Sequence, residues 1–96
     1  MFRILRVSGD SMFPEYKSGD FILIRTRSFL PSRLRSGDVI VFVNQLYGTL
    51  LKRIQRITDA GIYVIGSGEE SLDSRRLGPV NPDTVQGKVI WHIRRN

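Results

Sequence analysis

One serine and one lysine stand in surroundings that suit nucleophilic chemistry. Ser11 follows Gly9 and Asp10 and precedes Pro14, so that neither helical nor strand periodicity continues through this polar turn. Lys52 lies inside a largely apolar segment. A serine hydroxyl attacks a carbonyl effectively only when a neighbouring base removes its proton. The two residues therefore suggest a Ser/Lys pair, although a turn serine taken alone is more often structural.

The strand pattern around Lys52 predicts where its amine points. Alternation places Leu50, Lys52 and Ile54 on one face of the strand and Leu51 and Arg53 on the other, with Gln55 continuing the second face. Burial among apolar neighbours disfavours the ammonium form and lowers the pKa of a lysine, which would leave a neutral amine able to accept a proton. The Lys-Arg dipeptide taken alone favours an exposed strand lysine over a buried base.

A third polar motif lies later in the chain, at Ser71-Leu72-Asp73-Ser74-Arg75. Read from its residues alone, it is a solvated turn whose Ser and Asp side chains bond their own backbone. A hydroxyl placed beside a neutral amine would also have a chemical use, because the amine lone pair must be aimed at the serine.

Several short motifs occur in an order that resembles the order of motifs in the type I signal peptidases and in the related self-cleaving repressors. The motifs are Ser11-Met12-Phe13-Pro14, Gly19-Asp20 before the run Phe21–Ile24, Gly37-Asp38 before Val39–Val43, Lys52-Arg53, Ser71 to Arg75, and Gly87-Lys88-Val89. The resemblance extends over most of the chain. It identifies the sequence as similar to the signal peptidase I-like serine proteases, which use a Ser/Lys dyad.

This resemblance implies a role for each matched residue. Ser11 would be the nucleophile and Lys52 its base, with Ser71 orienting the lysine amine. Asp73 would pair with Arg75 and brace the loop. The backbone N–H of Ser11 is the expected oxyanion donor, because the turn exposes it beside the nucleophile.

Substrate recognition is expected to use extended peptide pairing with strand edges, which leaves alternate side chains to be bound in pockets. The family prefers small aliphatic residues before the cleaved bond. Val7, Met12 and Leu51 flank the dyad and are the candidates for shaping these pockets. Each of them also suits an ordinary core position.

The predicted function is that of a serine endopeptidase that removes an N-terminal leader from a precursor protein through an acyl-enzyme on Ser11. One compact branch that the chain resembles matures nickel-type superoxide dismutase. The first alternative is a self-cleaving repressor-type peptidase. Such proteins cut upstream of the nucleophile, where ten residues precede Ser11. The pair Ala60-Gly61 is a conceivable scissile bond but reads better as a hairpin turn.

A non-enzymatic nucleic-acid-binding β-barrel is the alternative from another class. It is motivated by 15 Lys and Arg residues against 9 acidic ones, a net charge of +6. A nucleic-acid platform should group its aromatic side chains beside basic ones, whereas the aromatic residues here are scattered from Phe2 to Trp91. Specific nucleic-acid binding is therefore not expected.

Composition also bears on cofactors and location. The chain has no cysteine and a single histidine, His92, so no metal site or other cofactor is predicted. Its longest apolar runs fall well short of the about 20 residues that span a bilayer. We expect a cytoplasmic protein with at most weak peripheral membrane contact, through a basic loop that carries Phe29, Leu30 and Pro31.

The pattern of short β-branched and aromatic runs between Gly, Pro, Asp and Ser clusters predicts an all-β fold, a small and mostly antiparallel domain with long loops that spans residues 1–96. Met12 to Lys17 is expected to close one helical turn. The predicted strands are Ile4 to Val7, Asp20 to Arg25, Asp38 to Asn44, Thr49 to Ile57, Gly61 to Ile65 and Val85 to Ile93.

Overall fold

The computed structural model describes residues 1–9, 12–26, 34–66 and 77–95. Within these residues the chain forms a single antiparallel sheet and one short 3-10 helix, which confirms the all-β prediction. The elements are β1 (Phe2–Arg6), β2 (Phe21–Thr26), β3 (Val39–Asn44), β4 (Gly48–Thr58), β5 (Gly61–Ile65), η2 (Pro82–Thr84) and β6 (Val85–Ile93).

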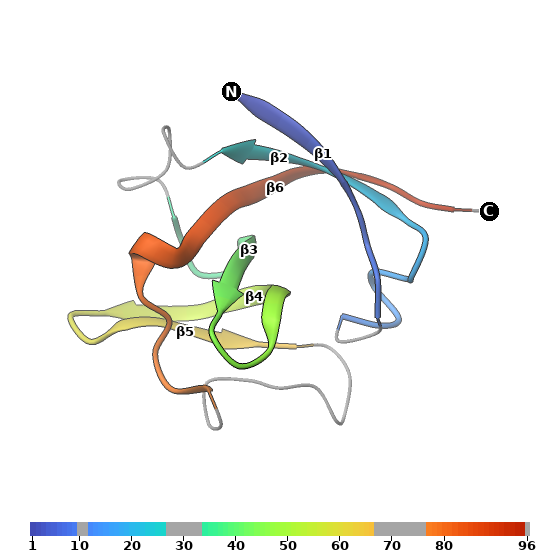
Figure 1. Cartoon of the computed structure of the whole chain (residues 1–96). Helices are drawn as coiled ribbons and strands as arrows, with labels where there is room; N and C mark the ends of the chain where they lie inside the picture. The colour runs from blue at the N-terminus through green and yellow to red at the C-terminus, as the bar shows by residue number, and fades with distance from the viewer. Residues whose placement is uncertain (10–11, 27–33, 67–76, 96) are drawn as a thin grey trace.

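The strand order in the sheet is β1-β2-β6-β3-β4-β5. The last strand in sequence therefore lies between β2 and β3, where it pairs antiparallel with both. The sheet is strongly curved, with β1, β2 and β6 in one part and the hairpin of β4 and β5 across from them (Figure 1). Insertion of β6 joins the N-terminal strands to the β3–β5 strands that follow them.

The strand bounds follow the sequence pattern closely. Gly61–Ile65 and Val85–Ile93 form as predicted, and the remaining strands differ by one or two residues at their ends. β1 ends at Arg6, one residue before the prediction, because Val7 leaves the regular ladder. Its N–H still donates to the carbonyl of Asp20, at 2.8 Å. The turn before Gly61 is a tight hairpin, as expected, in which Thr58 pairs with Gly61.

Two hydrophobic clusters lie on opposite sides of β3. The first contains Ile40 and Phe42 of β3 together with residues of β4, β5 and the segment around η2: Ile54, Ile62, Val64, Val80 and Val85. The second contains Val39 and Val41 of β3 together with Val7, Met12, Tyr16, Ile22 and Ile24. Because both faces of β3 are covered, its first four residues are all buried.

The connection from β1 to β2 carries the Ser11 motif, and its two ends are held together by backbone hydrogen bonds. Besides the bond from Val7 to Asp20, the N–H of Gly19 donates to the carbonyl of Val7 at 2.8 Å. Gly9 has φ +78°, a conformation that glycine adopts without the penalty of a side chain. Between these ends, the N–H of Tyr16 donates to the carbonyl of Met12 at 2.8 Å, which is the single helical turn expected there.

Candidate active site

Lys52 is fully buried in the middle of β4, with 0% of its surface exposed. It pairs across the sheet with Ile40 of β3, so the two side chains share one face. Ile54, on the same face, is 1% exposed and belongs to the first hydrophobic cluster, as does Ile40. Removal of water from around an amine disfavours its charged form. The structure therefore gives Lys52 the apolar surroundings that the alternation predicted.

Residues on the other face of β4 meet the connection that carries the serine motif. Leu51 packs against the second cluster, which contains Met12. Met12 follows Ser11 in the chain and Leu51 precedes Lys52. The immediate neighbours of both proposed dyad residues thus belong to one packed region of the molecule.

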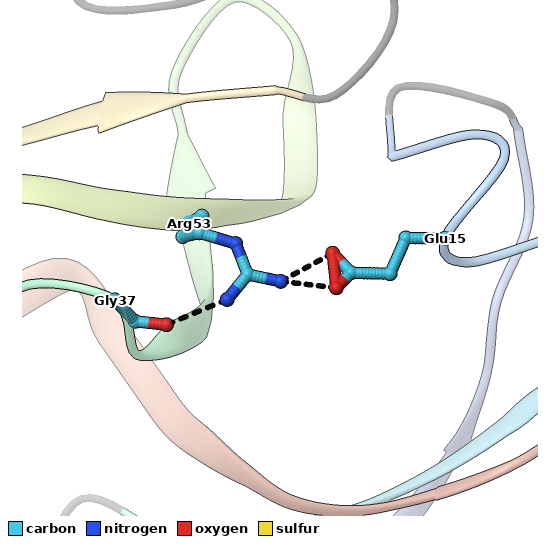
Figure 2. A network of polar contacts seen from close by, with 3 residues as sticks. All are labelled: Glu15, Gly37 and Arg53. Atoms are coloured by element: carbon cyan, nitrogen blue, oxygen red, sulfur yellow. Dashed lines mark hydrogen bonds and ion pairs between the residues drawn. The ribbon is translucent and has the colours of Figure 1, made fainter.

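Arg53 joins these two segments through polar contacts (Figure 2). Its Nη2 donates to both carboxylate oxygens of Glu15. Its Nη1 donates to the carbonyl of Gly37 at 2.7 Å. The sequence pattern places Arg53 on the face opposite Lys52, and the structure shows that this face is occupied by the Glu15 segment rather than by solvent alone.

Asp20 holds the far end of the same connection. Its side chain is buried, with Oδ1 accepting from the N–H of Arg95 at 2.9 Å and Oδ2 accepting from the N–H of Lys17 at 3.0 Å. His92 Nε2 lies 2.7 Å from Oδ2. The backbone donors of Arg95 and Lys17, followed by His92, lower the pKa of Asp20 to about 2. The carboxylate is therefore held in its charged form.

The rings of Tyr16 and His92 stack beside this carboxylate, with their centroids 4.2 Å apart. Burial raises the pKa of Tyr16, and the neighbouring Glu15 carboxylate acts in the same direction. Tyr16 thus stays neutral at ordinary pH and serves as an aromatic surface for His92. Together the stack and the Asp20 contacts attach the serine connection to β6.

The proposed nucleophile and its supporting motif are not part of the described structure. Ser11, Ser71, Asp73 and Arg75 lie outside the described residues, as does the basic loop that carries Phe29, Leu30 and Pro31. Their proposed roles stay predictions.

The proposed substrate-binding residues lie in or against the second cluster. Val7 is 8% exposed and Met12 is 1% exposed, so both are core residues in this structure. Leu51 is only partly buried. A role for any of the three in shaping a substrate pocket remains a prediction.

The described part of the chain also bears on metals and membranes. It contains no group of three or more His, Asp or Glu side chains placed to hold a metal ion. Within that same part of the chain, no helix has the length and apolar character needed to cross a bilayer.

Three contributors to this region had no evident role in the sequence: Glu15, Arg53 and His92. Glu15 and Arg53 are separated by 38 positions, and His92 and Asp20 by 72. The sequence offered one indication of the Glu15–Arg53 pair. An acidic residue, Glu15, closely follows Ser11, and a basic residue, Arg53, follows Lys52. Which carboxylate meets which arginine depends on the tertiary packing.

Comparison with known proteins shows the family to which the chain belongs. Residues 2–90 match the Peptidase S24-like family, a family that includes serine peptidases and self-cleaving repressors. The chain therefore belongs to the Peptidase S24-like family. It is also 31% identical over 93 residues to a LexA repressor from Petrotoga mobilis. The match covers 94% of this chain and 42% of that relative, so the chain spans less than half of the relative's length.

The family match refines the resemblance drawn from the motifs. It supports the branch of that resemblance that includes self-cleaving repressors. The narrower assignment to the signal peptidases, and to the nickel-type superoxide dismutase branch within them, stays a prediction.

Proposed function

We propose that the chain is a serine peptidase domain in which Ser11 is the nucleophile and Lys52 is the general base. The observation that carries this proposal is the complete burial of Lys52 beside Ile40 and Ile54. A lysine placed on a strand for solubility would keep its amine in water. Complete burial beside aliphatic side chains instead favours the neutral form that a base requires.

In this proposal the Lys52 amine accepts the proton of the Ser11 hydroxyl as Oγ attacks the carbonyl carbon of the scissile bond. The ammonium then donates that proton to the leaving amine, which gives an acyl-enzyme on Ser11. Water, activated by the neutral amine, hydrolyses the ester and restores the serine. The backbone N–H of Ser11 stabilises the oxyanion. Ser71 orients the amine, while Asp73 and Arg75 brace its loop.

We further propose that the cleaved bond lies in the polypeptide that carries this domain, as in a self-cleaving repressor-type peptidase. This choice is supported by the family match and by a relative named as a repressor. Removal of a leader from a separate precursor uses the same dyad and the same acyl-enzyme. The two functions differ only in which polypeptide supplies the scissile bond.

One cellular experiment separates these possibilities. N-terminal peptides are compared between cells that carry the wild-type protein and cells that carry Ser11→Ala. Self-cleavage predicts that the serine-dependent new N-terminus lies in the protein that contains this domain. A new N-terminus in another protein would show leader removal in trans. No serine-dependent N-terminus in any protein would contradict a peptidase function.

A chemical experiment tests the dyad without knowledge of the substrate. A fluorophosphonate probe should label the wild-type protein at Ser11, with Oγ bonding to phosphorus, fluoride leaving and the hydroxyl proton passing to Lys52. Ser11→Ala should not be labelled, and Lys52→Met should be labelled far more slowly. Equal labelling of Lys52→Met and wild type would refute Lys52 as the base.

The location of the reaction is part of the proposal. We place it in the cytoplasm, acting on protein segments without detergent or lipid. Cell fractionation tests this, because a membrane-pellet location that survives high salt would indicate a membrane partner instead.

A further inference from the structure

We propose that Glu15 and Arg53 form a positioning pair that sets the Ser11 turn against the strand that carries Lys52. This inference rests on the proposed function. It assigns a role in the reaction to two residues that need not touch the substrate. Glu15 lies four positions after Ser11 and Arg53 lies immediately after Lys52. Their contact therefore joins the two segments on which the proposed dyad residues stand.

The arginine is held at two points, which makes it a rigid link. Nη1 donates to the carbonyl of Gly37 while Nη2 donates to Glu15 (Figure 2). Gly37 is itself tied to β4, since its N–H donates to the carbonyl of Ile54 at 2.8 Å. The N–H of Ile54 in turn donates to the carbonyl of Asp38 at 2.7 Å. The planar guanidinium can serve both acceptors at once, whereas a lysine ammonium is a compact point charge on a flexible stem.

The position of Glu15 is coupled to the residues that follow Ser11 in the chain. It stands beside Tyr16, whose N–H donates to the carbonyl of Met12 and whose side chain is buried in the second cluster. Met12 is 1% exposed and adjoins Ser11 in the chain. A shift of Glu15 relative to β4 would therefore move a short, internally bonded segment that begins directly after the nucleophile.

The energetics favour a role in alignment over a role in stability. The two side chains are 33% and 38% exposed, and such solvent-accessible ion pairs contribute about 0 to 1 kcal/mol to folding. The fold should survive loss of the pair. Catalysis is far more sensitive to geometry, because a displacement of about 1 Å can reduce a rate by roughly 100-fold. Loss of the pair is therefore expected to lower activity while leaving the stability of the fold nearly unchanged.

The test measures the rate of fluorophosphonate labelling at Ser11 together with the thermal midpoint of unfolding. Glu15→Leu should reduce the limiting labelling rate at high pH by roughly 10- to 100-fold. Glu15→Gln, which retains one oxygen acceptor for Arg53, should lie between Glu15→Leu and wild type. Arg53→Lys should resemble Glu15→Leu despite its conserved charge. Both Glu15 variants should unfold within a few degrees of wild type.

The matched control is Lys88→Gln. Lys88 forms an ion pair with Asp38 at 3.2 Å, with side chains 27% and 20% exposed. This pair touches the same Gly37–Asp38 turn but does not involve Glu15. Lys88→Gln should therefore keep the wild-type labelling rate. An equal loss in Lys88→Gln and Glu15→Leu would show that turn integrity matters rather than the link to Glu15, and would overturn the proposal.

Two further readouts separate positioning from other effects. The pH at which labelling reaches half of its limiting rate should stay at the wild-type value in Glu15→Leu, because the pair acts on distance and not on proton affinity. A double variant of Glu15→Leu and Arg53→Leu should be no slower than the slower single variant. Wild-type rates in Glu15→Leu, or fully multiplicative losses in the double variant, would refute the pair.

Failure of this inference is distinguishable from failure of the proposed function. Wild-type labelling that depends on Ser11 and Lys52, combined with unaffected Glu15 variants, removes only the positioning role. Absence of Ser11 labelling in the wild-type protein removes the dyad, and the positioning role with it.

Discussion

Asp20 and Lys52 are both buried ionisable residues, and their surroundings differ in kind. Asp20, at the base of the serine connection, is 1% exposed and receives backbone hydrogen bonds from Lys17 and Arg95. Lys52, in the middle of β4, is 0% exposed and shares its face with Ile40 and Ile54. The first environment stabilises a charge, and the second disfavours one. A buried carboxylate that is surrounded by donors serves the fold, whereas full burial beside aliphatic side chains is what the proposed general base requires.

The largest effect expected from this comparison is a loss of activity without a loss of stability when Lys52 is replaced. Lys52→Met keeps an unbranched side chain of similar length and removes the amine, so the rate of Ser11 labelling should fall by roughly 1000-fold or more. Thermal stability should stay equal or rise, because an apolar side chain suits an apolar face. Lys52→Arg should also be inactive, since a guanidinium remains protonated.

Lys17→Met is the matched control for this substitution. The Lys17 side chain is exposed, and its contact with Asp20 is made by the backbone N–H. Its removal should change neither the labelling rate nor the thermal midpoint appreciably. Substantial labelling by Lys52→Arg, or a marked loss of stability in Lys52→Met, would mean that Lys52 is charged and structural like Asp20.

Asp20→Asn should show the opposite behaviour, because its main effect should be a loss of thermal stability. The carboxylate accepts with both oxygens, from Arg95 on Oδ1 and from Lys17 on Oδ2. An amide has only one acceptor oxygen, so its NH₂ group would face a backbone donor. We expect the thermal midpoint to fall by on the order of 10 °C. Asp59→Asn, in the exposed hairpin turn, is the control and should unfold like wild type.

The pH dependence of stability sharpens the same contrast. The pKa of Asp20 is about 2 in the folded protein, below its ordinary value of 3.8. A lowered carboxyl pKa adds stability that is fully present above the ordinary value and is lost as the pH falls through the folded value. The stability difference between wild type and Asp20→Asn should therefore be constant above about pH 5 and shrink toward pH 2. Urea unfolding at pH 6, 4, 3 and 2 measures it, and an unchanged difference at pH 2 would contradict the assignment.

The contrast also shows what the sequence can predict. Strand positions followed from local periodicity, and the burial of Lys52 followed from alternation along β4, because both depend on neighbours in the chain. The contacts of Asp20 with Arg95 and His92 did not follow, since they require β6 to enter the sheet beside β2. The link between Glu15 and Arg53 likewise depends on packing across 38 positions. The local pattern thus predicts the strand that carries Lys52, whereas its long-range contacts follow only from the tertiary structure.

The smallest effect is expected at His92, which contributes one side-chain contact to the Asp20 carboxylate. His92→Phe keeps a ring that can stack on Tyr16, 4.2 Å away in the wild-type structure, and removes only the Nε2 contact with Oδ2. The two backbone donors remain, so the thermal midpoint should fall by only a few degrees. The pKa of Asp20 should rise only part of the way toward its ordinary value, because His92 follows the backbone donors as a cause of the shift. The stability of His92→Phe should accordingly decline at a slightly higher pH than that of wild type. NMR titration of the Asp20 carboxyl carbon measures this directly, and a return to the ordinary value would mean that His92, rather than the backbone, holds the charge.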